Sequence, residues 1–112
     1  MKYRSREELV AQILETANGD SVGITKITVR TRIPYYLLKR YLTAMIEEGL
    51  IQRIGGRGVE LKEEKPTYKT TEKGLYFLKL YNELIELMIQ PSSKLKLYNN
   101  NKGNLNRPFF LG

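Results

Sequence analysis

The stretch TRIPYYLLKRYLTAMIEEGL, residues 31–50, carries the pattern that decides the fold. Five apolar side chains fall on one arc of a helical wheel at about 100° per residue: Leu37, Leu38, Tyr41, Leu42 and Met45. Pro34 fits the first position of this helix, because the N–H that proline lacks would have no partner there. Gly49 supplies the stop, so we predict a helix from about 34 to 48.

The opposite side of this helix is polar and mostly cationic: Tyr36, Lys39, Arg40, Thr43 and Glu47. Residues 21–46 hold five cations and no anion: Lys26, Arg30, Arg32, Lys39 and Arg40. Residues 47–90 hold seven cations and eight anions, so the positive charge is concentrated before Glu47. Any solvated helix can show such a face, but the lack of acids across the whole segment favours a binding surface.

Length and charge restrict the possible partners. The chain has 112 residues, which fits one domain with a single modest core. Nineteen Lys and Arg against twelve Asp and Glu give a net charge of +7, which suits a polyanion such as nucleic acid or an acidic membrane surface. No apolar stretch is long enough for a membrane span and the N-terminus lacks a signal-peptide core, so we expect a cytoplasmic, nucleoid-associated protein.

The missing residue types argue against catalysis. Without cysteine there is no disulfide, thiol nucleophile or thiolate zinc site, and without histidine the commonest general base is absent. The carboxylate pairs are adjacent in sequence, so on a helix they point about 100° apart and do not converge on one atom. We therefore expect no enzyme activity, metal or cofactor.

The segments before the central helix also read as helical. Ser5 and Glu8 have capping-box spacing and predict a helix over about 6–17 that ends at Asn18-Gly19. Residues 21–31 are rich in β-branched side chains, and a strand is the alternative there. Because their apolar positions do not alternate in twos, we favour a short helix near 24–30.

The segments after Gly49 predict a β-hairpin and a last helix. LIQRI (50–54) reads as a strand, GGRG (55–58) as a loop, and a second strand near 66–70 would return to pair with the first. Thr71 caps a helix that continues to Gln90, where Pro91 follows. The order predicts an α+β, mainly α fold: a winged helix-turn-helix with a β-hairpin wing and a long C-terminal dimerisation helix.

The last helix has an apolar arc far wider than the stripe of about 100° expected on a surface helix. Phe77, Tyr81, Leu84 and Met88 follow coiled-coil spacing, with Ile85 beside them. We therefore predict a homodimer through residues 72–90, the alternative being that the domain or the tail covers this helix. Residues 1–90 would form the domain and 91–112 a flexible, basic, Asn-rich tail.

Phosphate and base-edge contacts require exposed cations and hydrogen-bonding groups near the central helix. The candidate DNA-binding residues are Lys26, Arg30, Arg32, Tyr35, Tyr36, Lys39, Arg40, Thr43 and, in the wing, Arg57.

The run RIPYYLLKRYLTAMIEEGLI (32–51), followed by YKTTEKGLYFL (68–78), resembles the small archaeal winged-helix DNA-binding proteins. The best-known members of that family are dimeric chromatin proteins joined by an antiparallel coiled coil. The resemblance covers about residues 6–90 and implies that Tyr36, Lys39, Arg40 and Arg57 face DNA and that the last helix dimerises.

These observations predict a dimeric protein that binds double-stranded DNA, as a transcriptional regulator or as a nucleoid-type architectural protein. Two alternatives stay open: a protein-interaction module with an acidic partner, and an RNA-binding protein.

Overall fold

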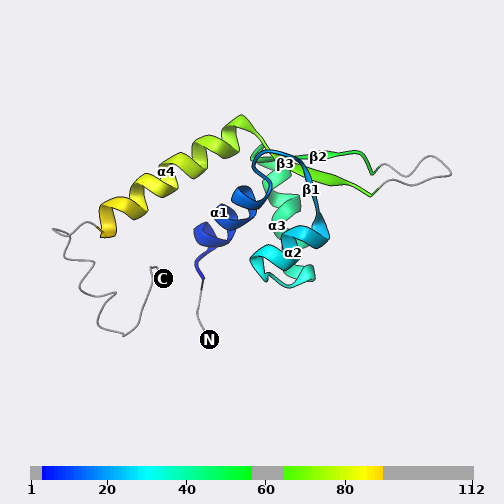
Figure 1. Cartoon of the computed structure of the whole chain (residues 1–112), viewed down its shortest axis with the longest axis horizontal. Coiled ribbons are helices and arrows are strands. Elements are labelled where there is room, and N and C mark those ends of the chain that lie inside the picture. The colour runs from blue at the N-terminus through cyan, green and yellow to red at the C-terminus, as the bar shows by residue number, and fades with distance from the viewer. Residues whose placement is uncertain (1–3, 57–64, 90–112) are drawn as a thin grey trace.

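The computed structural model describes residues 4–56 and 65–89. Its elements are α1 (Arg6–Thr16), β1 (Val22–Gly23), α2 (Ile24–Thr31), α3 (Tyr35–Glu47), β2 (Ile51–Ile54), β3 (Thr67–Thr70) and α4 (Glu72–Ile89). The fold is mainly helical, with a small antiparallel sheet beside the helices (Figure 1). The predicted fold class, a winged helix-turn-helix, is confirmed.

The sheet has three strands in the order β1-β3-β2. Strands β2 and β3 form the predicted hairpin, in which Arg53 lies opposite Tyr68 and Gln52 lies opposite Lys69. Strand β1 was not predicted. It consists of two residues, too few to show an alternating pattern, and it forms by pairing with β3.

Two predicted features of the helix-turn-helix can be compared with the structure. Residues Ile24–Thr31 are helical, so the helix favoured over a strand is confirmed, and Arg32 ends it in the left-handed region at φ 60°. The position predicted for Pro34 is wrong by one residue. Pro34 has an extended ψ of 147° and lies just before α3, where its carbonyl accepts from the Leu38 N–H at 2.8 Å.

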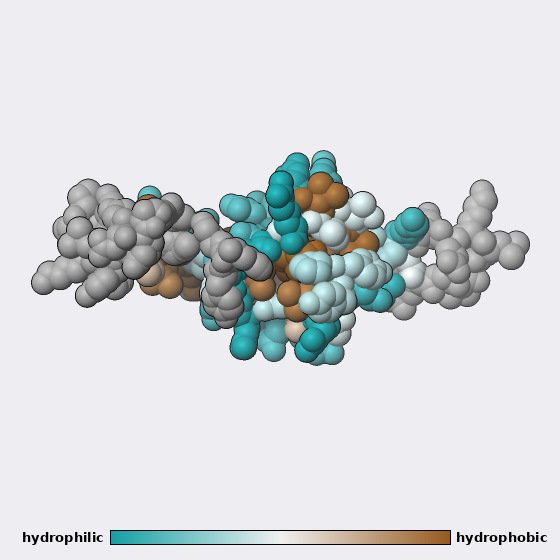
Figure 2. All heavy atoms as spheres, turned by 90° about the horizontal axis from the view of Figure 1, so that it is seen from below, coloured by the Kyte–Doolittle hydropathy of each residue, from teal (hydrophilic) through white to brown (hydrophobic). Residues whose placement is uncertain are grey.

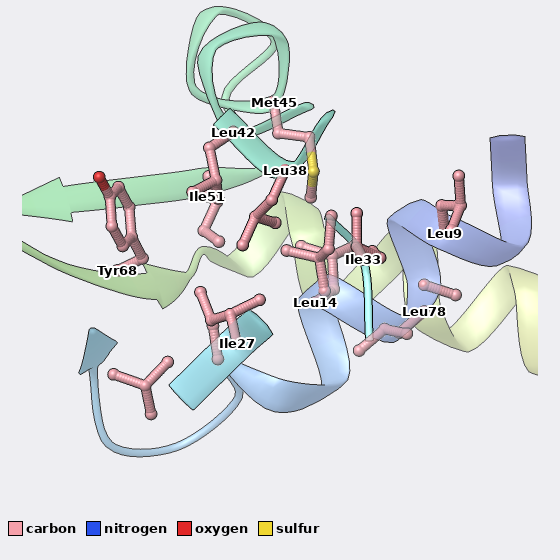
Figure 3. Packing of buried hydrophobic residues seen from close by; sticks show 14 residues of the cluster. Leu9, Leu14, Ile27, Ile33, Leu38, Leu42, Met45, Ile51, Tyr68 and Leu78 are labelled. Carbon is pink, nitrogen blue, oxygen red and sulfur yellow. The ribbon is translucent and has the colours of Figure 1, made fainter. Parts of the chain in front are cut away.

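The core collects side chains from all four helices and the sheet (Figure 3). Its largest fully buried members are Ile13, Leu14, Ile27, Ile33, Leu38 and Ile51. In α3, Leu38, Leu42 and Met45 are buried while Tyr36, Lys39, Arg40 and Thr43 are exposed, which confirms the two faces predicted for this helix. Burying the first face fixes which side chains α3 presents to solvent.

Helix α4 is attached at its first turn to the end of α3 and the start of β2. The Thr71 hydroxyl accepts from the Gly74 N–H at 3.1 Å and donates to the Gly49 carbonyl at 2.6 Å, so the predicted cap is present. Gly74 is buried, and a Cβ there would collide with the Leu50 carbonyl oxygen. The first turn of α4 therefore passes the Leu50 backbone at a distance that only glycine permits.

Beyond this first turn, α4 passes α1 and continues past its end (Figure 1). Leu78 is buried, and Phe77 and Tyr81 pack partly against the core. Figure 2 shows apolar surface on the left of the molecule, where Figure 1 places α4.

Candidate nucleic-acid interface

The first two turns of α3 present aromatic and cationic groups together. Tyr35 and Tyr36 are 55% and 67% exposed, although tyrosine is usually half-buried in a packing role. Lys39 lies one turn after Tyr35, and its Nζ is 5.5 Å from the centre of the Tyr35 ring. This cation–π contact orients the ammonium group at the helix surface.

Arg40 and Thr43 continue this exposed face. The Thr43 hydroxyl donates to the Lys39 carbonyl at 3.0 Å, so its proton is used within the helix and its oxygen can still accept. Arg40 keeps the planar fork of donors that recognises phosphate or guanine.

The cations of α2 lie in two places. Lys26 is exposed in the first turn, close in sequence to Thr25, which borders the α3 side of the domain. Arg30 and Arg32 instead border a cleft of about 910 Å³ against α1, whose other wall includes Glu8 and Glu15. The carboxylates make the electrostatic potential of this cleft less favourable for an anion. Arg30 and Arg32 therefore face a different environment from the cations of α3.

Arg4 holds this second region in place. Its Nη1 donates to the Thr31 carbonyl at 2.6 Å and to Gln12 Oε1 at 2.7 Å. The guanidinium thus satisfies a carbonyl at the C-terminal end of α2 and joins it to α1. Its donors serve the fold.

A second cleft, of about 630 Å³, lies between α3 and the wing. Tyr35, Lys39 and Thr43 border it on the α3 side, and Arg53 and Lys65 border it on the wing side. Arg53 and Lys65 were not among the predicted site residues. Arg53 could have been found from the sequence, because it lies two residues after Ile51 in the predicted strand. Residues two apart in a strand point to the same face, so Arg53 shares the face of the buried Ile51.

Salt bridges within the described part of the chain do not involve these cations. Among residues 4–56 and 65–89, the only salt bridge joins Lys79 to Glu83 on α4. Within the same ranges, no group of three or more acidic side chains could hold a metal ion. The described cations of α2, α3 and the wing therefore have no carboxylate of another described residue within 4.0 Å.

The residues predicted for the dimer interface occupy two parts of α4. Phe77 and Tyr81 stack at 6.4 Å and are half-buried on the domain's own side. Burial raises the pKa of Tyr81, and the carboxylates of Glu8, Glu7 and Glu15 on α1 raise it further. Ile85 and Met88 are half-buried, whereas Leu84 is 54% exposed.

Of the five residues predicted for the interface, Leu84 is fully on the exposed side of α4. Four exposed apolar residues of α4 are spaced four, four and three apart and form its exposed apolar face: Tyr76, Leu80, Leu84 and Leu87. Arg57 and residues 91–112, also named in the predictions, lie outside the described part of the chain.

A family model described as winged helix-turn-helix matches residues 3–89. The chain belongs to this family. The match spans the helix-turn-helix, the wing and α4, and it agrees with the resemblance found in the sequence.

Two solved structures share this winged-helix fold. One is Sso10a-2, a DNA-binding protein from Sulfolobus solfataricus, with a TM-score of 0.68 and 21% identity over 95% of this chain and 100% of that one. The other is a MarR-family transcriptional regulator from Silicibacter pomeroyi, with a TM-score of 0.54 and 17% identity over 93% of this chain and 74% of that one. No curated protein sequence matches. At these identities the likenesses concern the fold.

Within the described ranges, no helix is both long and apolar enough to span a bilayer.

Proposed function

We propose that this winged-helix protein binds double-stranded DNA through α3 and the wing. The observation that carries the proposal is the exposed face of α3, where Tyr35, Tyr36, Lys39 and Arg40 stand together and neither cation forms a salt bridge with a described residue. A helix with such donors fits the major groove, and its cations meet the flanking phosphates. Sso10a-2, of similar fold, is described as a DNA-binding protein, which supports this partner.

The N-terminal half of α3 enters the groove. Glu47 at the end of the helix is exposed and would repel phosphates, so the closest approach occurs over the first two turns. Tyr36 and Arg40 point outward one turn apart and reach base edges or phosphates, while Lys39 contacts the backbone.

The protein acts as a homodimer joined through α4. The exposed apolar face of Tyr76, Leu80, Leu84 and Leu87 supports this part of the proposal, because water-exposed leucines at helical spacing favour association with a second helix. Two DNA-binding faces on one dimer suit a nucleoid-associated regulator or an architectural protein.

Binding of purified protein to one duplex sequence, made as DNA and as RNA, tests this proposal. We expect DNA to bind more tightly, because the deep, narrow major groove of duplex RNA does not admit a helix. The logarithm of the DNA association constant should fall linearly with the logarithm of salt concentration, by about 0.9 per phosphate contacted. Equal or tighter binding of RNA would favour the RNA alternative, and loss of all duplex binding would refute the proposal.

The role on DNA is tested by selecting bound sequences from a random duplex pool. Enrichment of one motif indicates a regulator with an operator, whereas an unchanged pool indicates an architectural protein that contacts the backbone.

A further inference from the structure

The cleft between α3 and the wing brings together cations that are far apart in the sequence. Lys39 comes from α3, Arg53 from β2, and Lys65 from the residue pair just before β3. Among residues 4–56 and 65–89, no acidic residue lines this cleft of about 630 Å³. Three positive charges therefore border one concave site.

The strand register explains why Arg53 belongs to this site. Arg53 lies opposite Tyr68, which is buried, so both residues are on the sheet face that packs toward α3. Lys69 pairs with Gln52 on the other face of the hairpin and is exposed there. The same sheet thus carries one cation inside the cleft and one outside it.

Arg53 is held at the cleft by the turn that follows β2. Its Nη2 donates to the Gly56 carbonyl at 3.0 Å, which orients the guanidinium and leaves its other N–H groups as donors. Gly56 in turn adopts φ +77° and lies against Pro66, next to Lys65. The Arg53–Gly56 hydrogen bond and the approach of Gly56 to Pro66 therefore place both wing cations at the same end of the hairpin.

The remaining lining of the cleft is both apolar and polar. Leu42 and Tyr68 contribute apolar groups to its wall. Tyr35 and Thr25 add hydroxyl groups at the edge. Helix α2 also begins here, and its N-cap Gly23 makes no side-chain cap, so the first N–H groups of that helix receive no side-chain acceptor.

We propose that this cleft binds one phosphodiester group of the DNA backbone, with Lys39, Arg53 and Lys65 around it. The inference rests on the proposed DNA binding and adds a defined contact to it. A phosphate held between α3 and the wing fixes how far α3 enters the neighbouring groove, so Arg53 and Lys65 set the docking position independently of base sequence.

The test compares duplex DNA binding by three versions of the full chain across a salt series. They are the wild type, the double variant Arg53→Gln/Lys65→Gln, and a control with the same loss of charge, Lys69→Gln/Lys79→Gln. All four side chains are exposed, so folding should be kept, and circular dichroism checks it. We expect the cleft variant to bind about tenfold more weakly and its salt slope to be smaller by about 0.9, the value for one phosphate.

The control should keep the wild-type slope, because Lys69 and Lys79 lie outside the cleft. A fourth version, Arg53→Lys/Lys65→Arg, is added as a second control: it keeps both charges and should keep the slope as well. If the cleft variant matches the control while the wild type binds DNA, the phosphate site is refuted and the proposed function stands. If the wild type does not bind duplex DNA, both proposals fail.

Discussion

Gly74 shows how one residue determines the position of a whole helix. It lies in the first turn of α4, where its backbone passes the Leu50 carbonyl and the side chains of Thr70 and Leu14. In a helix, alanine is normally better than glycine by about 1 kcal/mol. At this position the close crossing reverses that preference, because a Cβ would displace α4 from the core.

We predict that Gly74→Ala lowers the free energy of unfolding by about 2 kcal/mol, within the range of overpacked cores. Urea denaturation followed by circular dichroism measures it. The matched control is Gly23→Ala, since a Cβ on Gly23 would meet no atom within 4 Å, and a change below about 1 kcal/mol is expected there. A Gly74→Ala protein as stable as the wild type would show that α4 is free to shift.

At the scale of elements, helix α4 presents more apolar surface than one domain covers. Its inner side holds Phe77, Leu78 and Tyr81 against α1 and the core. Its outer side exposes Tyr76, Leu80, Leu84 and Leu87, of which Leu84 and Leu87 are 54% and 60% exposed. A partner helix on this side would remove these side chains from water.

We predict that the wild type has a solution mass of twice the chain mass of 13.0 kDa. We also predict that Leu84→Glu converts it to a monomer. A buried carboxylate without a partner opposes association. Light scattering at micromolar concentration measures the mass. Asn82→Glu adds the same charge on the polar strip of α4 and should leave the dimer intact. A wild-type monomer at this concentration would contradict the proposed dimer.

The elements could largely be predicted from the sequence, because each long helix is amphipathic over several turns and carries local start and stop signals. Ser5 and Thr71 are two such start signals, because each side chain accepts from a backbone N–H in the first turn of the helix that follows it. Strand β1 could not be predicted, because two residues acquire strand geometry only by pairing with β3. Pro34 was misplaced by one position, since proline is acceptable both at and just before the first helical residue.

The candidate site was harder to predict for a different reason. The acid-free run from residue 21 to residue 46 is continuous in sequence, but the fold directs Arg30 and Arg32 toward α1 and Lys39 toward the wing. Conversely, Arg53 and Lys65 join Lys39 only through the hairpin register and the turn at Gly56. Local patterns identify which faces are cationic, whereas long-range pairing decides which cations share a site.

At the scale of the whole molecule, the described residues of α1 and those of the cleft between α3 and the wing differ in charge. The acidic side chains Glu7, Glu8 and Glu15 belong to α1, next to α4, while α3 and the wing side of the cleft contribute cations. With DNA as the proposed partner, this separation would orient the protein before contact and raise the association rate at low salt.

The central claim is that the exposed face of α3 binds DNA, and the double variant Lys39→Ala/Arg40→Ala tests it most directly. Its affinity for duplex DNA is compared with that of Lys69→Ala/Lys79→Ala, which loses the same charge from the other face of the wing and from α4. We predict that the α3 variant binds at least about tenfold more weakly than this control, with a salt slope smaller by about 1 to 2. Equal binding by the two variants, both folded by circular dichroism, would contradict the account.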